Sequence, residues 1–543
     1  MVDARSKNPR VHPEREIPNY EGGSIPRMNT HLSEVTTTAA LAEKKKLRTG
    51  LWRFDMICFT VVSIVAITLL GAFAANGAQA FTWLLISAVT LFLPYGLLVA
   101  ELGSTFPLEG GIYEWCKLAG GRLYAAFAAT FYWIAVPLFF GGTAVVGVIA
   151  AIKIFWFGSA SYLFGGHLVT DVLVELAIAL LLIWGITFGA IISLSHGKWI
   201  SIVGFFVKLA LLAIFLVLAA VFVVSGSGKG GHVAVSDLIP TNWGLIASSI
   251  LPVVVYLWLG AEMQSNAAEE MDNPQRDVPL AILRACIIVV IFYSLLLLSI
   301  LIALPTRQLS AIGSFLNAFQ TIDGVLPTPL STWLGWLVAL GFAMSLVASG
   351  VTVFIAVSRT YAIAALDRAA PLRLGHFSRR FGTPISATLL SGMVATVMVF
   401  ASIGLSAYGS ENIGTLFVQA LGVAILTQLL SYLLIIPTFL ILRYKFPAVP
   451  RKYRVPGGLV GAWVVTLLPM AYVGIACYYL LIPSDGYLQY IHLDRLTYEL
   501  TQFVPLACIV LLTLVMYALG QRERQNRDVL VELGGSPGTE SSL

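Results

Sequence analysis

The chain has 543 residues, of which 58% are hydrophobic and only 11% charged, and its mean hydropathy is +0.86. Soluble domains carry roughly a quarter of charged residues, so this composition excludes a soluble protein and indicates one that lies in a bilayer. The net charge of +5 is spread over short segments between apolar runs, which argues against a nucleic-acid partner. The five cysteines lack the paired spacing of a metal site, so neither a metal nor another cofactor is expected.

The first 50 residues are polar and rich in Pro, Ser and Thr, and we expect them to be disordered. Their start, MVDARSKNPR, lacks the apolar core of a secretory signal. Beyond them, apolar segments long enough to cross a bilayer, about 20 residues each, recur roughly twelve times. They lie near 54–74, 81–103, 123–152, 170–194, 199–225, 244–268, 280–303, 330–365, 385–405, 413–441, 459–482 and 499–520.

Basic residues are distributed unequally between the two sides of these spans. If the N-terminus is inside, about fifteen Lys and Arg residues lie in loops on its side and only four on the other side. Short cytoplasmic loops carry the excess of basic residues in membrane proteins. We therefore expect both termini in the cytoplasm, and the plasma membrane is the expected location.

The segment that follows the second predicted span contains Pro107, Gly110 and Gly111 within ELGSTFPLEGGIYEWCKLAGG, residues 101–121. Such a cluster is typical of a tight turn. We expect this segment to form a cytoplasmic loop that leads into the third span.

A lysine lies inside the fifth predicted span. Lys208 is about nine residues into ISIVGFFVKLALLAIFLVL, on the order of 13 Å deep and beyond easy reach of the interface. An ionisable residue within a membrane segment indicates function, and burial disfavours the charged form of an amine. We expect Lys208 to gain and lose a proton in a coupling role. The alternative is a structural cation satisfied by carbonyl groups of a neighbouring helix.

The most informative segment is YLWLGAEMQSNAAEEMDNPQRDVP, residues 256–279. An apolar run without charge from about Leu245 reaches Gly260 and Ala261 and then meets Glu262. A helix interrupted by glycine and a carboxylate exposes backbone groups that bind polar ligands. This pattern is typical of a substrate-binding helix in a transporter.

The role of Glu262 has three possible forms. The carboxylate could take up a proton, pair with a cation, or hold the break closed through hydrogen bonds. We expect a gating or proton-linked role, with a purely structural role as the alternative.

Three segments resemble, in the same order, motifs of the amino acid–polyamine–organocation permeases. GAEMQSNAAEEMDNPQRDVP resembles their sixth-span signature, and ELGSTFPLEGGIYEW resembles the loop after their second span. SRTYAIAALDRAAP, followed by FGTPISA, resembles their eighth-to-ninth-span segment. The ordered match covers about residues 54–441, and the last two spans match only in hydropathy.

The resemblance implies a leucine-transporter-type fold, an inverted repeat of five plus five helices whose first and sixth helices are broken at the substrate site. It implies a cytoplasmic tail over 1–50, a ten-helix transport core over 51–441, two additional helices over 442–521 and a cytoplasmic tail over 522–543. The first helix should break near Ala66, Ile67 and Thr68, with Gly71 as a further candidate. Ala66 and Thr68 stand where the family usually has glycines, which tightens the approach of a substrate carboxylate and favours a non-standard substrate.

The resemblance also suggests roles for individual residues. Lys208 matches a lysine whose ammonium stands where sodium-coupled members of the fold hold an ion, which favours proton coupling or exchange. Tyr256 matches an aromatic position near the site and is expected to stack over the substrate as a gate. Ser345 and Ser349 lie near the ion-site region of the eighth span, and their alternative is a role as small packing residues.

Three functions follow from these observations. The first is a secondary transporter of an amino acid or related amine, working by alternating access with proton symport or exchange. The second is a polyamine or organic-cation carrier, which acidic residues in the cavity would favour, and Glu262 is the obvious candidate. The third is a nutrient sensor that binds substrate without net transport. An integral-membrane enzyme is least expected, because no metal cluster or nucleophile motif occurs in the sequence.

Overall fold

The computed structural model describes residues 53–108, 110–158, 168–192, 197–225, 235–239, 241, 243–270, 274–303, 314–404 and 413–532. Within these ranges the chain forms helices joined by turns and contains no strand, so the predicted all-α class is confirmed. The predicted tail over 1–50 lies outside the described residues, as does the end of the chain after 532.

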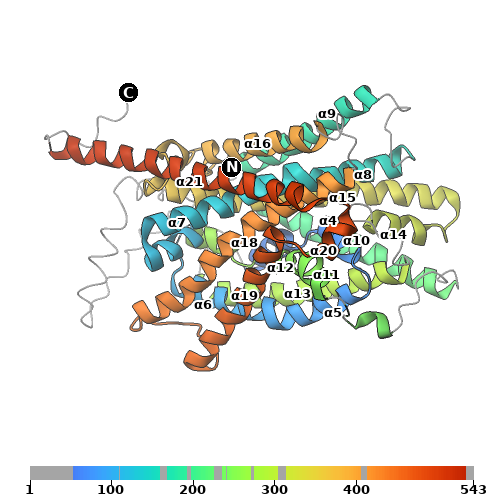
Figure 1. Ribbon diagram of the computed structural model, residues 1–543, viewed down its shortest axis with the longest axis horizontal. Coiled ribbons are helices and arrows are strands. Elements are labelled where there is room, and N and C mark those ends of the chain that lie inside the picture. Colours follow the sequence, from blue (N-terminus) through green and yellow to red (C-terminus); the bar gives the residue numbers. More distant parts are fainter. Residues whose placement is uncertain are drawn as a thin grey trace, which may run out of the picture.

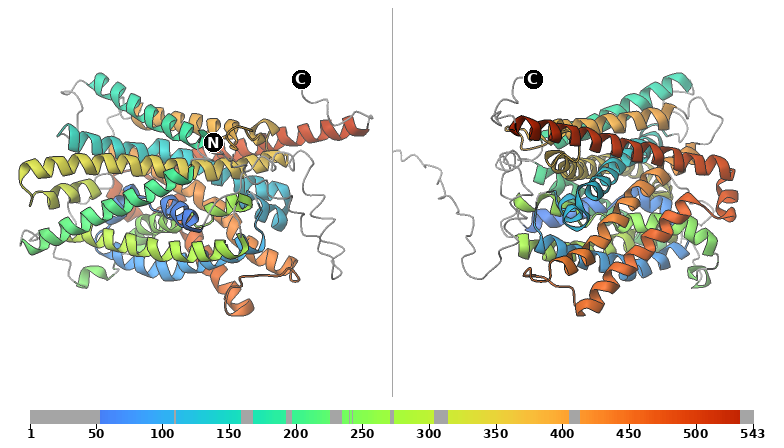
Figure 2. Two further views of the ribbon diagram at one scale, coloured as in Figure 1. Left: turned by 180° about the vertical axis from the view of Figure 1, so that it is seen from behind. Right: turned by 60° about the vertical axis from the view of Figure 1, so that its left-hand side comes forward.

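Most of the long helices lie side by side in one bundle, inclined to one another (Figures 1 and 2). The elements, in chain order, are α3 (Arg53–Ile64), α4 (Ile67–Ala74), α5 (Gln79–Ser87), η1 (Ala88–Phe92), α6 (Leu93–Thr105), α7 (Ile112–Phe139), η2 (Phe140–Ala144), α8 (Val145–Trp156), α9 (Leu168–Ile192), α10 (Gly197–Val224), η3 (Val235–Leu238), α11 (Trp243–Leu245), η4 (Ile246–Ile250), α12 (Leu251–Trp258), η5 (Met263–Glu270), α13 (Pro274–Ala303), α14 (Ser314–Asp323), α15 (Thr328–Leu366), η7 (Leu372–Gly375), α16 (Ile385–Val399), η8 (Phe400–Gly404), α18 (Ile413–Lys445), α19 (Gly458–Leu481), α20 (Asp485–Ile491) and α21 (Arg495–Glu532).

Ten helices of the described part are long and apolar enough to cross a membrane. Each overlaps one of the predicted spans. The two remaining predicted spans, the first and the sixth, are each divided into two short helical pieces. The total of about twelve spans and the inverted relation between two halves stay predictions.

The two breaks lie near the middle of their spans. The first separates α3 from α4 at Val65 and Ala66, and the second separates α12 from η5 over Leu259 to Glu262. Gly260 has φ = +115°, a backbone conformation that other residues rarely adopt. Glycine therefore allows the chain to leave α12 at the place where the sequence predicted a break.

Helix boundaries differ from the predictions at two places. The predicted loop over 101–121 is shorter, because α6 runs to Thr105 and α7 already begins at Ile112. Gly121, which suggested a turn, lies inside α7 at a kink with φ = +83°. At the other end of the chain, α21 continues to Glu532, past the predicted boundary at 521. Its last part projects beyond the bundle (Figures 1 and 2).

Helix α7 with its extension α8 forms the centre of the bundle, and α21 lies at its edge. In the most apolar stretch of α7 and α8, 89% of the residues are buried, whereas in the most apolar stretch of α21 only 17% are buried. Central packing is close enough to demand small residues: a side-chain carbon on Gly141 would lie 2.2 Å from the carbonyl oxygen of Ala395. Small residues that allow helices to approach are typical of membrane bundles.

Candidate functional site

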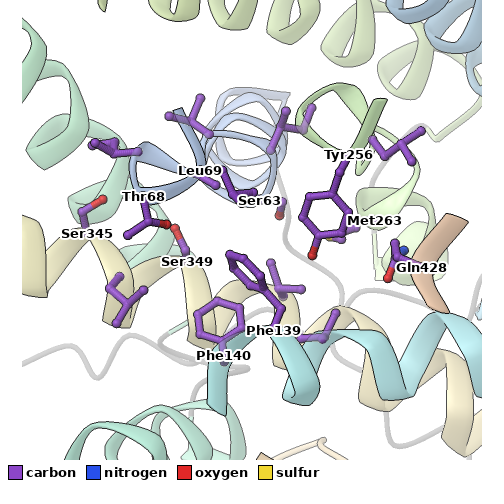
Figure 3. A pocket seen from close by; sticks show the side chains of 18 of the residues that line it. Ser63, Thr68, Leu69, Phe139, Phe140, Tyr256, Met263, Ser345, Ser349 and Gln428 are labelled. Carbon is purple, nitrogen blue, oxygen red and sulfur yellow. The ribbon is translucent and has the colours of Figure 1, made fainter. Parts of the chain in front are cut away.

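A pocket lies between the two helix breaks, where α3, α4, α7, α12, α15 and α18 meet (Figure 3). Its empty space, including the open mouth, is about 780 Å³. Twenty residues line it: Ser63, Ile64, Val65, Ala66, Ile67, Thr68, Leu69, Val136, Phe139, Phe140, Tyr256, Leu259, Met263, Phe342, Ser345, Leu346, Ser349, Val353, Gln428 and Tyr432.

The structure brings most of the predicted site residues to this pocket. The residues of the predicted list that line it are Ala66, Ile67, Thr68, Tyr256, Ser345 and Ser349. Gly71 does not line it, because it lies inside α4 and is not part of the break. Gly260 and Ala261 form the second break but do not line the pocket themselves. Lys208 and Glu262 lie behind its wall, in contact with lining residues.

The first break presents free backbone amides to the pocket. Helix α4 begins there without a side-chain cap, and the amides of Ile67 and Thr68 form no hydrogen bond with the described residues. The first amides of a helix have no partner within it and carry the positive end of the helix dipole. The start of α4 is therefore suited to bind a carboxylate.

Tyr293 of α13 connects the two sides of this break, and the sequence analysis missed it. Its hydroxyl accepts a hydrogen bond from the amide of Ala66 at 3.0 Å and donates one to the carbonyl of Ile64 at 2.7 Å. Both groups would otherwise be unpaired where the helix is interrupted. Tyr293 is 0% exposed, so water cannot replace its hydroxyl without a rearrangement.

Substituting Tyr293→Phe is expected to lower the stability of the protein by roughly 1–3 kcal/mol, the cost of leaving buried polar groups unpaired. Thermal unfolding of the detergent-purified variant measures the effect. The matched control is Tyr361→Phe, which removes a buried hydroxyl that lies beside the side chain of Thr130 and not at a helix break. Equal shifts for the two variants would show that the hydroxyl of Tyr293 does not hold the break.

Lys208 connects the first break to α15. Its ammonium donates to the carbonyl of Val62 at 3.0 Å, to the carbonyl of Val65 and to the hydroxyl of Ser349 at 2.7 Å. Ser349 itself donates to the carbonyl of Val62 at 3.1 Å, so its oxygen is free to accept from the lysine. An ammonium has three donors, and each has an acceptor here. Lys208 therefore holds a cation against the broken helix, next to the pocket.

Glu262 accepts three hydrogen bonds from tyrosine hydroxyls. Tyr95 donates to one carboxylate oxygen at 2.6 Å, and Tyr132 and Tyr432 donate to the other at 2.8 Å and 2.6 Å. We call these three residues the tyrosine cluster. Glu262 is 0% exposed and has no ion-pair partner in the described part of the chain. The carboxylate is therefore hydrogen-bonded at the break, and its gating or proton-linked role stays a prediction.

The tyrosine cluster joins three helices at the second break. Tyr95 comes from α6, Tyr132 from α7 and Tyr432 from α18, and the ring of Tyr432 lies 5.6 Å from that of Tyr95 and 6.3 Å from that of Tyr132. Tyr432 also lines the pocket. A substrate in the pocket can therefore contact Tyr432, which is hydrogen-bonded to Glu262.

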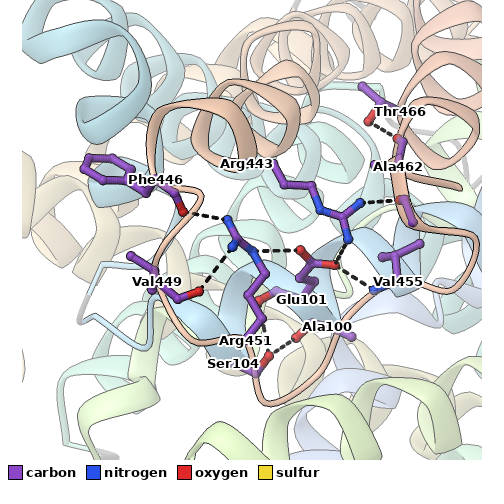
Figure 4. Close-up of polar contacts among 11 residues, drawn as sticks. Ala100, Glu101, Ser104, Arg443, Phe446, Val449, Arg451, Val455, Ala462 and Thr466 are labelled. Carbon is purple, nitrogen blue, oxygen red and sulfur yellow. Dashed lines mark hydrogen bonds and ion pairs between the residues drawn. The ribbon is translucent and has the colours of Figure 1, made fainter. Parts of the chain in front are cut away.

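A second buried carboxylate, Glu101, lies in the last part of α6, next to the loop that the sequence predicts to be cytoplasmic. Figure 4 shows its polar contacts. One of its oxygens lies 3.2 Å from a guanidinium nitrogen of Arg443 and accepts from the amide of Val455 at 2.7 Å. The other lies 3.1 Å from Arg451. Glu101 is 1% exposed. It therefore fixes the linker between α18 and α19 to the end of α6.

Substituting Glu101→Gln is expected to destabilise the protein by about 2 kcal/mol, because two buried arginines lose their counter-charge. The cost stays below that of an isolated buried charge, since Arg443 and Arg451 keep carbonyl partners. Thermal unfolding tests this. Glu499→Gln serves as the control, because it removes a more exposed ion pair with Arg495, of the kind that contributes little. A shift for Glu101→Gln as small as that of the control would contradict the expectation.

Comparison with known proteins finds a matching family and several relatives of this chain. A family model described as amino acid permease matches residues 50–514. A probable agmatine/putrescine antiporter of Lactococcus lactis subsp. lactis (strain IL1403) is 29% identical over 79% of this chain and 86% of its own. A glutamate/gamma-aminobutyrate antiporter of the same strain is 23% identical over 88% and 92%. A branched-chain amino acid permease of Bacillus subtilis (strain 168) is 22% identical over 77% and 86%.

The family match covers nearly the whole described chain, including both breaks and the pocket between them. It confirms the resemblance that the three ordered motifs indicated, and it confirms a multi-pass membrane transporter rather than an enzyme. The architecture of broken helices around a central pocket fits the leucine-transporter-type fold. The chain belongs to the amino acid permease family.

Proposed function

We propose that this permease transports an amino acid or related amine by alternating access, and that Lys208 couples transport to protons. The observation that supports the coupling is the position of the lysine ammonium. It is held by two carbonyls of the broken first helix and by Ser349 of the pocket wall. A movement of either helix changes its contacts, so the affinity of Lys208 for its proton depends on which side the pocket faces.

The substrate is proposed to bind across the two breaks. Its carboxylate takes the free amides of Ile67 and Thr68 at the start of α4, where the helix dipole favours an anion. Helix α12 ends at the second break, so its last carbonyl groups, at the negative end of that dipole, are suited to the amino group. Tyr256 covers this arrangement from the wall, with its ring 5.7 Å from that of Phe139.

Glu262 is proposed to act as a gate through the tyrosine cluster. Three helices converge on its carboxylate, so their relative movement must break hydrogen bonds to it. Protonation would remove one acceptor site and loosen the cluster. At the end of α6, Arg443 and Arg451 lie beside Glu101, and this concentration of arginines supports a cytoplasmic orientation of that end and of both termini.

Exchange of two substrates is a second candidate, supported by the antiporters among the relatives. A diamine substrate, as the name of the first of them indicates, belongs to this candidate. It lacks the carboxylate for which the start of α4 is suited.

Uptake into proteoliposomes tests both candidates. Radiolabelled neutral, cationic and acidic amino acids and putrescine are offered with and without an inward proton gradient, and each condition is repeated with unlabelled substrate inside. Accumulation driven by the gradient alone supports proton-coupled transport. Uptake that requires preloaded substrate supports exchange instead. Absence of uptake for every compound that binds the purified protein would contradict transport itself.

A further inference from the structure

Gln428 of α18 is a buried polar side chain whose hydrogen-bonding groups are unused. It is 3% exposed and lines the pocket. Its amide lies close enough to the hydroxyl of Tyr432 for an electrostatic contact, but neither its amide oxygen nor its amide nitrogen forms a hydrogen bond of normal geometry with a described residue. Buried polar groups in proteins are nearly always paired. A side chain with two unpaired atoms facing a substrate cavity therefore indicates a partner that belongs to the ligand.

The pocket has polar side chains at its two ends and two phenylalanine rings between them, with Ser63 and the hydroxyl of Tyr256 on the intervening wall (Figure 3). Thr68, Ser345 and Ser349 lie at one end, next to the start of α4, and Gln428 lies at the other, with Phe139 and Phe140 between. Thirteen of the twenty lining residues are apolar, and none of the twenty carries a charged side chain. The ligand that fits has one end for the α4 amides, an apolar middle and a far end for Gln428.

The chemistry of Gln428 restricts the far end of the ligand. A carboxamide offers both a donor and an acceptor. A ligand ammonium has donors only and would leave the amide nitrogen of Gln428 unpaired, whereas a carboxylate has acceptors only and would leave its oxygen unpaired. Each buried group left unpaired costs roughly 1–3 kcal/mol. A carboxamide carries its donor and its acceptor side by side on different atoms, as Gln428 does, so it can pair with both groups of Gln428 at once, whereas a hydroxyl offers a single oxygen for both.

Charges behind the wall disfavour a diamine further. The end of the pocket near Ser349 adjoins the Lys208 ammonium at 2.7 Å, which repels a second cation there. At the other end the carboxylate of Glu262 is already bound by the three hydroxyls of the tyrosine cluster. A ligand ammonium would have to displace one of these hydroxyls to reach it.

We propose that the substrate is a zwitterionic amino acid with an uncharged side chain that ends in a carboxamide, and that Gln428 sets this specificity. This inference rests on the proposed function, because it takes the pocket as the substrate site. It separates the chain from relatives whose names state agmatine, putrescine or branched-chain amino acids.

The test measures binding of glutamine, asparagine, leucine, glutamate, agmatine and putrescine to the purified protein in detergent, by calorimetry and thermal stabilisation. The unmodified protein should bind one of the two carboxamides roughly tenfold more tightly than leucine or putrescine, as one or two buried hydrogen bonds require. Gln428→Met, of similar length, should weaken carboxamide binding roughly tenfold and strengthen leucine binding. The fold should tolerate it, because Gln428 has no hydrogen bond within the described residues to lose.

Two further variants complete the experiment. Gln419→Met, on the same helix and outside this pocket, should leave all affinities unchanged. Gln428→Glu, which offers acceptors only, should favour the amines over the carboxamides. Tighter binding of putrescine or agmatine than of any carboxamide in the unmodified protein would overturn the proposed substrate class. Equal loss for every ligand in Gln428→Met would overturn the role of Gln428.

Binding and transport are measured separately, so the specificity of Gln428 and the transport function can fail independently. Binding is measured without a gradient or a second compartment, so ligands that bind with the expected order but are not transported would contradict transport and support the specificity. Transport of putrescine in preference to amino acids would contradict the specificity alone. If no member of the panel binds to protein that unfolds cooperatively, both proposals are wrong.

Discussion

Substituting Lys208→Met is expected to abolish accumulation of substrate driven by a proton gradient. In the unmodified protein an inward gradient of one pH unit should drive about tenfold accumulation if one proton enters with each substrate. One pH unit supplies 1.36 kcal/mol per proton, which balances about a tenfold ratio of substrate concentrations. Methionine has a similar length but no proton to exchange. The variant should therefore equilibrate or exchange substrate without concentrating it, and the pH dependence of its initial rate should become weaker, because only the contribution of Glu262 remains. Uptake into proteoliposomes with and without the gradient measures both quantities.

The fold is expected to survive this change. Ser349 keeps its own hydrogen bond to the carbonyl of Val62, so part of the connection between the broken helix and α15 remains. Lys445→Met is the matched control, because it removes a lysine whose ammonium binds the carbonyl of Leu118 near the surface. That variant should accumulate substrate as the unmodified protein does. Persistent gradient-driven accumulation in Lys208→Met would show that Lys208 is a structural cation.

Substituting Glu262→Leu is expected to abolish transport and to destabilise the protein by several kcal/mol. Three buried hydroxyls would lose their acceptor at once, and each costs roughly 1–3 kcal/mol when left unpaired. Glu262→Gln, which keeps one acceptor oxygen and removes the charge, should lose much less stability. Thermal unfolding and proteoliposome exchange measure the two effects.

The pair of variants separates a gate from a structural support. If Glu262 works by binding and releasing a proton, Glu262→Gln should fold well and yet show a weaker pH dependence of its transport rate, with only the contribution of Lys208 left. If the residue only holds the break together, Glu262→Gln should keep both transport and its pH dependence. Tyr472→Phe, which removes a hydroxyl that is bonded to Thr90 and not to Glu262, controls for the loss of a tyrosine hydroxyl in general.

Local patterns predicted the helices and one of the two breaks. Hydropathy alone locates spans, because a membrane helix must be continuously apolar. Gly260 followed by Glu262 is unfavourable within such a helix, so the second break is visible in the sequence. The first break occurs at Val65 and Ala66, which carry no signal of their own, and only the resemblance to a family placed it. Gly71 misled the prediction, since glycine is tolerated inside membrane helices.

The partners of the predicted residues could not be predicted. The three tyrosines lie 167, 130 and 170 residues from Glu262 along the chain, and in the sequence each resembles an ordinary aromatic core residue. Tyr293 and Gln428 likewise appear as single polar groups within apolar spans. The general expectation that polar residues inside the membrane are functional was applied only to charged side chains. Extending it to buried hydroxyls and amides would have found all five.

The convergence of three helices on one carboxylate also limits reorientation of the transporter without substrate, which would let protons leak across the membrane. A hydrogen bond to a charged group contributes roughly 1.5–3 kcal/mol, so breaking two of the three bonds to Glu262 without replacement raises the barrier by roughly 3–6 kcal/mol. That slows reorientation by about 10² to 10⁴. If a bound substrate offsets this cost, an empty transporter would rarely change sides, and the gradient across the membrane would be conserved when substrate is scarce.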